Sequence, residues 1–340
     1  MRNLLTWISF GLCSVAVFAL ACNKQKDVVT EPIVFKAPDG WPATVYDFNA
    51  NPITNAGFAL GKKLFYDGKL SKDGNFPCGS CHQQFAAFSN YDHDFSHGFN
   101  NQFTTRNAPA LNNLAWQSAF HRDGGISNLD LQPLAPITAP NEMAETIPHV
   151  LAKLAADPDY PALFKAAFAD GAINTANMTK ALSQFMLMLV SADAKYDQVK
   201  AGTASFDVNE AAGYALFQSK GCTNCHAEPL FTNNAYVNDN LPVDPVRNDV
   251  GRMAITGDAA DYGKFKVPSL RNVALSFPYM HDGRFGSLSE VMSHYAQTIS
   301  LNAGEQDLLI AFLQTLTDSS LTKNPLFSPD VDVPQVHIHN

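Results

Sequence analysis

A mainly α-helical fold with two related halves is predicted by three features of the sequence. Apolar residues recur at helical spacing in several segments, and no segment alternates apolar and polar residues convincingly as a strand would. A short sequence unit occurs twice, once in each half of the chain. The 340 residues, 46% of them apolar and 11% aromatic, are enough for two modest globular domains.

The duplicated unit ends in a C-x-x-C-H motif. Residues 56–60 and 212–216 are similar to each other, and each segment precedes one copy of the motif on a predicted helix. The spacing is that of a c-type haem attachment site, in which two thiols bind the haem vinyl groups and the histidine binds iron. A redox dithiol or half a zinc site would share this pattern, but two copies favour two covalently bound haem c groups. The predicted haem-binding residues are Cys78, Cys81, His82, Cys222, Cys225 and His226.

The N-terminus predicts export. Residues 1–21 contain one arginine and a long apolar run, as in a signal peptide, and Ala21-Cys22 resembles the end of a bacterial lipobox. Ala19 stands where leucine is usual, so an ordinary signal peptide and an uncleaved anchor are the alternatives. We expect a periplasmic lipoprotein anchored to the membrane through Cys22, with residues 22–44 as a tether.

The remaining cysteines and the charge limit other functions. Cys13 lies in the leader, so no cysteine pair is left for a structural disulfide. The formal charge of −9 argues against nucleic acid as a partner. We predict an N-terminal haem domain at 45–195, a C-terminal haem domain at 196–320 and a tail at 321–340; a homodimer is one option for the assembly.

The predicted helices alternate with two long irregular segments. Helical patterns cover 147–156, 160–169, 174–189, 288–298 and 302–316, and Asp207 with Glu210 and Asn302 with Glu305 form capping-box patterns. Residues 83–139 and 228–266 show little periodicity. Long irregular segments in a compact protein are often functional.

Several motifs in these segments identify a family resemblance. They occur in the order Arg106-Asn107-Ala108-Pro109-Ala110-Leu111, Asp123-Gly124-Gly125, Pro140-Asn141-Glu142-Met143, Pro268-Ser269-Leu270-Arg271-Asn272-Val273-Ala274 and Pro278-Tyr279-Met280-His281-Asp282-Gly283. Over residues 53–316 the sequence resembles the bacterial dihaem cytochrome c peroxidases and their MauG relatives. The resemblance implies two cytochrome c-like haem domains in tandem, with long functional loops.

The resemblance also implies a division of labour between the haems. The haem on His82 would reduce hydrogen peroxide to water, and the haem on His226 would receive electrons from a small cytochrome c or cupredoxin. Glu142 matches the distal acid/base and Gln132 its polar companion. His97 matches a histidine that caps the N-terminal iron in the resting enzyme, and His93 is the alternative.

Further matches concern the haems and one calcium ion. Arg271, in the matched Pro268 motif, is expected among the haem-binding residues. The resemblance implies calcium between the domains, bound by the side chain of Asn107 and by the carbonyl oxygens of Ser276 and Pro278, since calcium prefers oxygen ligands.

Two positions depart from the peroxidase pattern. Arg122 stands where the family usually has tryptophan between the haems, and its charge could pair with a haem propionate. The sixth ligand of the C-terminal iron is Met in the peroxidases and Tyr in MauG. The interval from Pro278 favours Tyr295 over Met292 here. The alternatives to a peroxidase are therefore a MauG-like oxidase acting on a protein or small molecule and, third, an electron carrier without catalysis.

Overall fold

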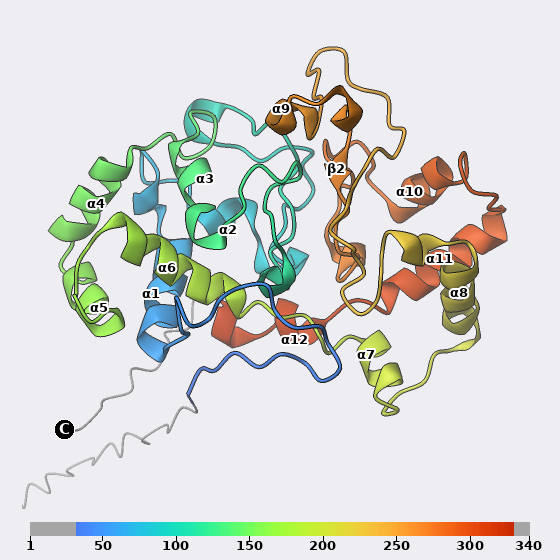
Figure 1. Ribbon diagram of the computed structural model, residues 1–340, viewed down its shortest axis with the longest axis horizontal. Coiled ribbons are helices and arrows are strands. Elements are labelled where there is room, and N and C mark those ends of the chain that lie inside the picture. The colour runs from blue at the N-terminus through green and yellow to red at the C-terminus, as the bar shows by residue number, and fades with distance from the viewer. Residues whose placement is uncertain (1–31, 330–340) are drawn as a thin grey trace, which may run out of the picture. The chain divides into compact units, whose positions relative to one another are not determined.

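The computed structural model describes residues 32–329 and is mainly helical (Figure 1). The helices are α1 (Asn55–Tyr66), α2 (Cys78–Cys81), α3 (Leu134–Thr138), α4 (Ile147–Ala156), α5 (Tyr160–Ala167), α6 (Thr175–Leu187), α7 (Lys195–Lys200), α8 (Val208–Ser219), α9 (Met253–Thr256), α10 (Leu288–Tyr295), α11 (Ala303–Gln314) and α12 (Ser319–Thr322). The strands β1 (Tyr236–Val237) and β2 (Phe265–Lys266) pair antiparallel. Strands this short carry no recognisable alternation, so the sequence did not predict them.

The duplicated unit forms a helix pair in each half of the chain. Helix α1 packs against α6, and α8 packs against α11 (Figure 1). Both pairs approach closely at a glycine: an ideal Cβ on Gly61 would lie 1.9 Å from the Ala181 carbonyl oxygen, and one on Gly213 would lie 1.9 Å from the Leu308 carbonyl oxygen. A side chain at either position would therefore push the two helices apart.

The helix starts follow the predicted capping chemistry. Asp207 and Glu210 form a reciprocal capping box at α8, and Asn302 and Glu305 form one at α11. The helix predicted at 288–298 ends earlier, at Tyr295, because the chain continues there into turns.

Two hydrophobic clusters stabilise the described residues. One draws mainly on α1, α4, α5 and α6, and the other on α8, α10 and α11. Leu321 and Phe327, from the predicted tail, lie in the first cluster, and the hydroxyl of Tyr66 donates to the Phe327 carbonyl oxygen at 2.8 Å. The last described residues thus return to the N-terminal half.

The predicted leader, Cys22 and the start of the tether lie outside the described residues, as do residues 330–340. Within residues 32–329 no helix combines the length and the apolar character needed to cross a membrane.

Candidate active site

The first C-x-x-C-H motif forms the short helix α2 and presents its histidine in a defined orientation. The His82 backbone N–H donates to the Cys78 carbonyl oxygen at 3.0 Å, which closes the turn. The His82 Nδ1 lies 2.9 Å from the Phe88 carbonyl oxygen, so Nδ1 carries the proton and Nε2 keeps its lone pair. Burial lowers the pKa of His82 and favours the neutral ring. This is the form in which imidazole binds a metal.

The second motif has the same arrangement. The His226 backbone N–H donates to the Cys222 carbonyl oxygen at 2.9 Å. The His226 Nδ1 faces the carbonyl oxygens of Phe231 at 3.1 Å and Pro268 at 3.2 Å, and burial again lowers the pKa of the ring. Both histidines are therefore oriented by backbone acceptors to offer Nε2 to a ligand.

A cleft of about 630 Å³, including space open to solvent, lies over the first motif. Cys78, Cys81 and His82 line it, together with apolar side chains that include Phe65 and Leu182. The two thiols, the neutral imidazole and the apolar walls fit a covalently bound haem. Among residues 32–329 no group of three or more His, Cys, Asp or Glu side chains is arranged to hold a metal ion.

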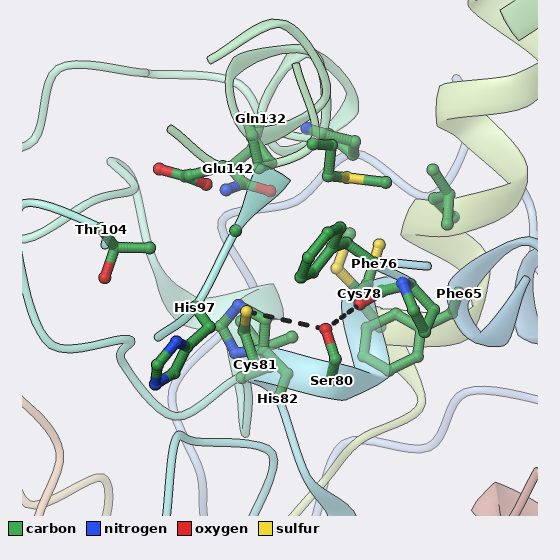
Figure 2. Close-up of a pocket in the computed structure, with 18 residues that line it drawn as sticks. Phe65, Phe76, Cys78, Ser80, Cys81, His82, His97, Thr104, Gln132 and Glu142 are labelled. Atoms are coloured by element: carbon green, nitrogen blue, oxygen red, sulfur yellow. Dashed lines mark hydrogen bonds between the residues drawn. The ribbon is translucent and has the colours of Figure 1, made fainter. Parts of the chain in front are cut away.

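Glu142 and Gln132 line the same cleft, and their joint role as acid/base and polar companion stays a prediction. In Figure 2 they lie at one end of it, and Cys78, Cys81 and His82 lie toward the other. Burial raises the pKa of the Glu142 carboxyl group.

The position of Glu142 depends on a close backbone contact with the loop that carries His97. The Phe99 N–H donates to the Glu142 carbonyl oxygen at 2.7 Å. A Cβ on Gly98 would lie 2.2 Å from the Asn141 carbonyl oxygen and 2.7 Å from Glu142 Cα. Only glycine fits there.

Gln132 has a neighbour that the sequence motifs did not assign. Its Nε2 lies 3.5 Å from the Nε2 of His121, whose pKa is lowered by burial. His121 has a φ of 65°, which places its ring beside Gln132 although eleven residues separate them. Its place next to the Asp123-Gly124-Gly125 motif was the only available signal.

His97 lines the cleft, but its ring faces outward. The side chain is exposed, and its ring packs 4.6 Å from Phe103 and 5.5 Å from His93, centroid to centroid. Figure 2 shows the ring pointing away from Gln132 and Glu142. The role of His97 as an iron cap stays a prediction.

Comparison with known proteins agrees with this geometry. The family model for di-haem cytochrome c peroxidases matches residues 55–205. The methylamine utilization protein MauG of Methylorubrum extorquens is 35% identical over 322 residues, which cover 89% of this chain and 89% of MauG. The chain belongs to the di-haem cytochrome c peroxidase family. Membership implies two haem c groups and an oxidoreductase.

Other relatives of this peroxidase family member carry both kinds of name. The cytochrome c551 peroxidase of Nitrosomonas europaea is 35% identical over 280 residues, covering 79% of this chain and 83% of that protein. A solved MauG-like protein associated with microbial copper homeostasis is 32% identical, with a TM-score of 0.79 over 87% of this chain and 99% of that one. The dihaem peroxidase BthA of Burkholderia thailandensis shares the fold, with a TM-score of 0.72 at 20% identity, over 89% of this chain and 98% of BthA.

The two candidates for the sixth ligand of the second haem in this family member lie on α10 in different surroundings. Burial raises the pKa of Tyr295, and the charges of Asp239, Cys225 and Cys222 add to the rise, so the phenol lies near the second motif. Met292 is 9% exposed and belongs to the second hydrophobic cluster. His294, the residue before Tyr295, faces the Asp239 carbonyl oxygen at 2.9 Å. Tyr295 also packs against the second hydrophobic cluster, so the choice between the two ligands stays a prediction.

Of the calcium ligands inferred from the family, Asn107 already has another partner, while the roles of the Ser276 and Pro278 carbonyl oxygens stay predictions. The Oδ1 of Asn107, which should bind the ion, accepts from the Arg122 Nη2 at 2.8 Å, and the Asn107 carbonyl oxygen accepts from the Arg122 Nε at 2.8 Å. Arg122 therefore binds Asn107 through these two nitrogens. Its pairing with a haem propionate stays a prediction. An oxygen that already accepts from a cation is a poor calcium ligand, so Asn107 does not fit the ion.

Arg271 also has fixed partners in this family member. Its guanidinium is buried and forms two 2.8 Å bonds with the Asp197 carboxylate, and its Nε donates to the Pro229 carbonyl oxygen at 2.9 Å. These contacts join α7 to the loop after the second motif. A haem contact of Arg271 stays a prediction.

Proposed function

We propose that this protein is a di-haem peroxidase that reduces hydrogen peroxide to water at the N-terminal haem. Electrons would come from a small cytochrome c or cupredoxin and enter through the C-terminal haem on His226. One observation carries the proposal: Glu142 and Gln132 line the cleft formed around Cys78, Cys81 and His82. An electron carrier without catalysis has no use for an acid in that position.

The chain's own residues supply the proton transfers. Cys78, Cys81 and His82 would hold the haem, which would supply an iron able to bind peroxide and to transfer electrons. The overall reaction takes hydrogen peroxide, two electrons and two protons to two waters. One oxygen of peroxide must lose a proton and the departing oxygen must gain one. A carboxylate held beside both oxygens can take the first proton and deliver it to the second.

The surroundings of Glu142 suit this task. Its raised pKa brings the carboxyl group closer to the working pH, which favours both uptake and release of a proton. Gln132 offers an amide that can donate to peroxide, and its contact with His121 restrains the amide. Apolar side chains such as Phe65 and Leu182 line the same cleft.

Steady-state turnover tests the proposal. The protein, with both haems bound and pre-reduced, is given peroxide and a reduced small cytochrome c. We expect fast oxidation of the donor by the wild type and loss of this activity in Glu142→Gln. The control is Asp307→Asn, a matched carboxylate-to-amide change at an exposed position on α11, which should keep the activity. Equal rates in all three proteins would contradict the proposal.

A second function is favoured by the surroundings of Tyr295. A phenolate ligand stabilises ferric iron, whereas methionine raises the potential, so tyrosine would make the C-terminal haem a poor electron store. The protein would then act as a MauG-like oxidase on a protein or small molecule. Peroxide consumption without oxidation of the cytochrome donor, but with oxidation of an added aromatic substrate, would favour this function.

Location and assembly rest on the sequence alone. We infer export to the periplasm and attachment to the membrane by a lipid on Cys22, from the leader and the lipobox-like end. A homodimer stays an option.

A further inference from the structure

Arg122 is held at both its backbone and its side chain. Its carbonyl oxygen accepts from the Lys266 N–H on β2 at 2.6 Å. Its guanidinium donates from Nε and Nη2 to the two oxygens of Asn107, both at 2.8 Å. A planar guanidinium that donates to two oxygens at once is held in one orientation.

Asn107 is itself fixed by its remaining groups. It is 3% exposed, its backbone N–H donates to the His281 carbonyl oxygen at 2.9 Å, and its Nδ2 donates to the Asp94 carbonyl oxygen at 3.3 Å. The Nδ2 contact turns Oδ1 toward Arg122. Asn107 and Arg122 together thus connect the segment around 107 and 122 with two segments of the C-terminal half, at 266 and at 281.

The charges around this connection disfavour a further cation. The guanidinium of arginine keeps its positive charge at neutral pH. Arg106 and Asp282 act electrostatically on Arg122, and Arg122 and Asp123 act on Lys266, so further cations lie near this connection. A divalent ion bound to Asn107 Oδ1 would lie next to the Arg122 guanidinium, which is within hydrogen-bonding distance of that oxygen. The two positive charges would repel each other.

We propose that Arg122 replaces the calcium ion that the family resemblance implies between the two haem domains. Its guanidinium is a built-in cation that binds the Asn107 oxygens and joins the two halves of the molecule. The protein then needs no calcium. The departure from tryptophan at position 122 and the loss of the calcium site are one change, because the same side chain accounts for both.

Calcium binding to the wild-type protein tests this directly. The protein with both haems bound is dialysed against calcium chloride and then against calcium-free buffer, and calcium per haem is measured. Thermal unfolding is followed with and without a calcium chelator. We expect no retained calcium and no shift in Tm on chelation. One calcium per chain, or a lower Tm in chelator, would overturn the proposal whatever the peroxidase activity is.

Variants test the role of the guanidinium. Arg122→Ala removes the connection and should lower Tm by several degrees, whereas Lys165→Ala, which removes an exposed charge on α5, should leave Tm unchanged. Arg122→Lys keeps the charge without the two-point contact, and its Tm should fall between those of Arg122→Ala and the wild type. An unchanged Tm in Arg122→Ala would overturn the proposal. If that variant does not fold, the wild-type calcium measurement still decides.

Discussion

At the scale of single residues, backbone carbonyl groups orient the two histidines that would bind iron. His82 faces the Phe88 oxygen and His226 faces the Phe231 and Pro268 oxygens. These contacts select one tautomer and one ring orientation before any ligand is bound. For the carboxyl group of Glu142, burial alone raises the pKa.

The raised pKa of Glu142 predicts the pH dependence of the peroxide reaction. The carboxylate must be ionised to take the first proton, so the rate should fall as pH drops through its pKa. Because that pKa is raised, the fall should begin at a higher pH than for an exposed glutamate. The measurement is the rate of peroxide reduction against pH. In Glu142→Gln the fall in rate at low pH should disappear. If the same fall persists in this variant, another group causes it.

The two candidate ligands of the second iron, Tyr295 and Met292, lead to opposite spectroscopic predictions. If Tyr295 binds the second iron, Tyr295→Phe should alter the near-infrared and magnetic spectra of that haem and raise its potential, and Met292→Leu should leave both unchanged. If only Met292→Leu loses the native ligand band, the Tyr295 assignment is wrong and the second iron has the methionine ligand usual in the peroxidases.

At the scale of elements, the side chain of Glu145, just before α4, holds the first turns of that helix. The Glu145 side chain is 4% exposed, and its carboxylate accepts from the Thr146 N–H at 2.8 Å and from the Lys153 Nζ at 2.7 Å. His149 lies 2.9 Å from the same carboxylate. Burial acts to raise the pKa of Glu145, but these hydrogen bonds outweigh it and lower the pKa to about 2.

This shift predicts a loss of stability in acid. Because the folded-state pKa lies below the ordinary value, the stabilisation is present above about pH 4.5 and is lost as pH falls toward 2. The contribution is at most about 3 kcal/mol at neutral pH. Glu145→Gln should therefore lower the free energy of unfolding at pH 7 and have little effect near pH 2. Denaturant unfolding at both pH values checks this, and equal losses at the two would contradict it.

The glycine contact between α8 and α11 predicts a second stability effect. Gly213→Ala places a methyl group against the Leu308 carbonyl oxygen and should destabilise the protein by about 1–3 kcal/mol. Gly304→Ala on α11 is a matched control, because its Cβ meets only Asn302 Oδ1, at 3.4 Å, and alanine favours the helix. Thermal unfolding of the pair should separate them, and equal Tm values would show that the helices adjust without cost.

Local patterns predicted the elements better than the contacts between them. The haem motifs, the capping boxes at Asp207 and Asn302 and the main helices each depend on neighbouring residues, so a sequence carries them directly. The bond from Arg122 to Asn107 depends on how two loop segments pack, and no local pattern shows it. For the same reason, the sequence did not predict that Leu321 and Phe327 pack in the first hydrophobic cluster.

At the scale of the whole molecule, segments far apart in the sequence form one site. The cleft takes its thiols from residues 78–81 and its polar groups from residues 132 and 142. The order of motifs predicted that these residues act together, but it did not show His121 beside Gln132 or the outward ring of His97. The connection through Arg122 adds a link between the two halves of the chain, at a position where the resemblance implied an ion.

The central claim is that peroxide reacts at the N-terminal haem with Glu142 as the acid/base. The most direct measurement is a single turnover in which fully reduced protein is mixed with peroxide and oxidation of both haems is followed by rapid-mixing absorbance. Glu142→Gln should slow this step by roughly 10²–10⁴-fold. The substitution should not lower Tm at pH 7. A carboxyl group whose pKa is raised in the folded protein destabilises the fold when it ionises, as pH rises through that pKa. A variant that oxidises its haems as fast as the wild type would contradict the claim.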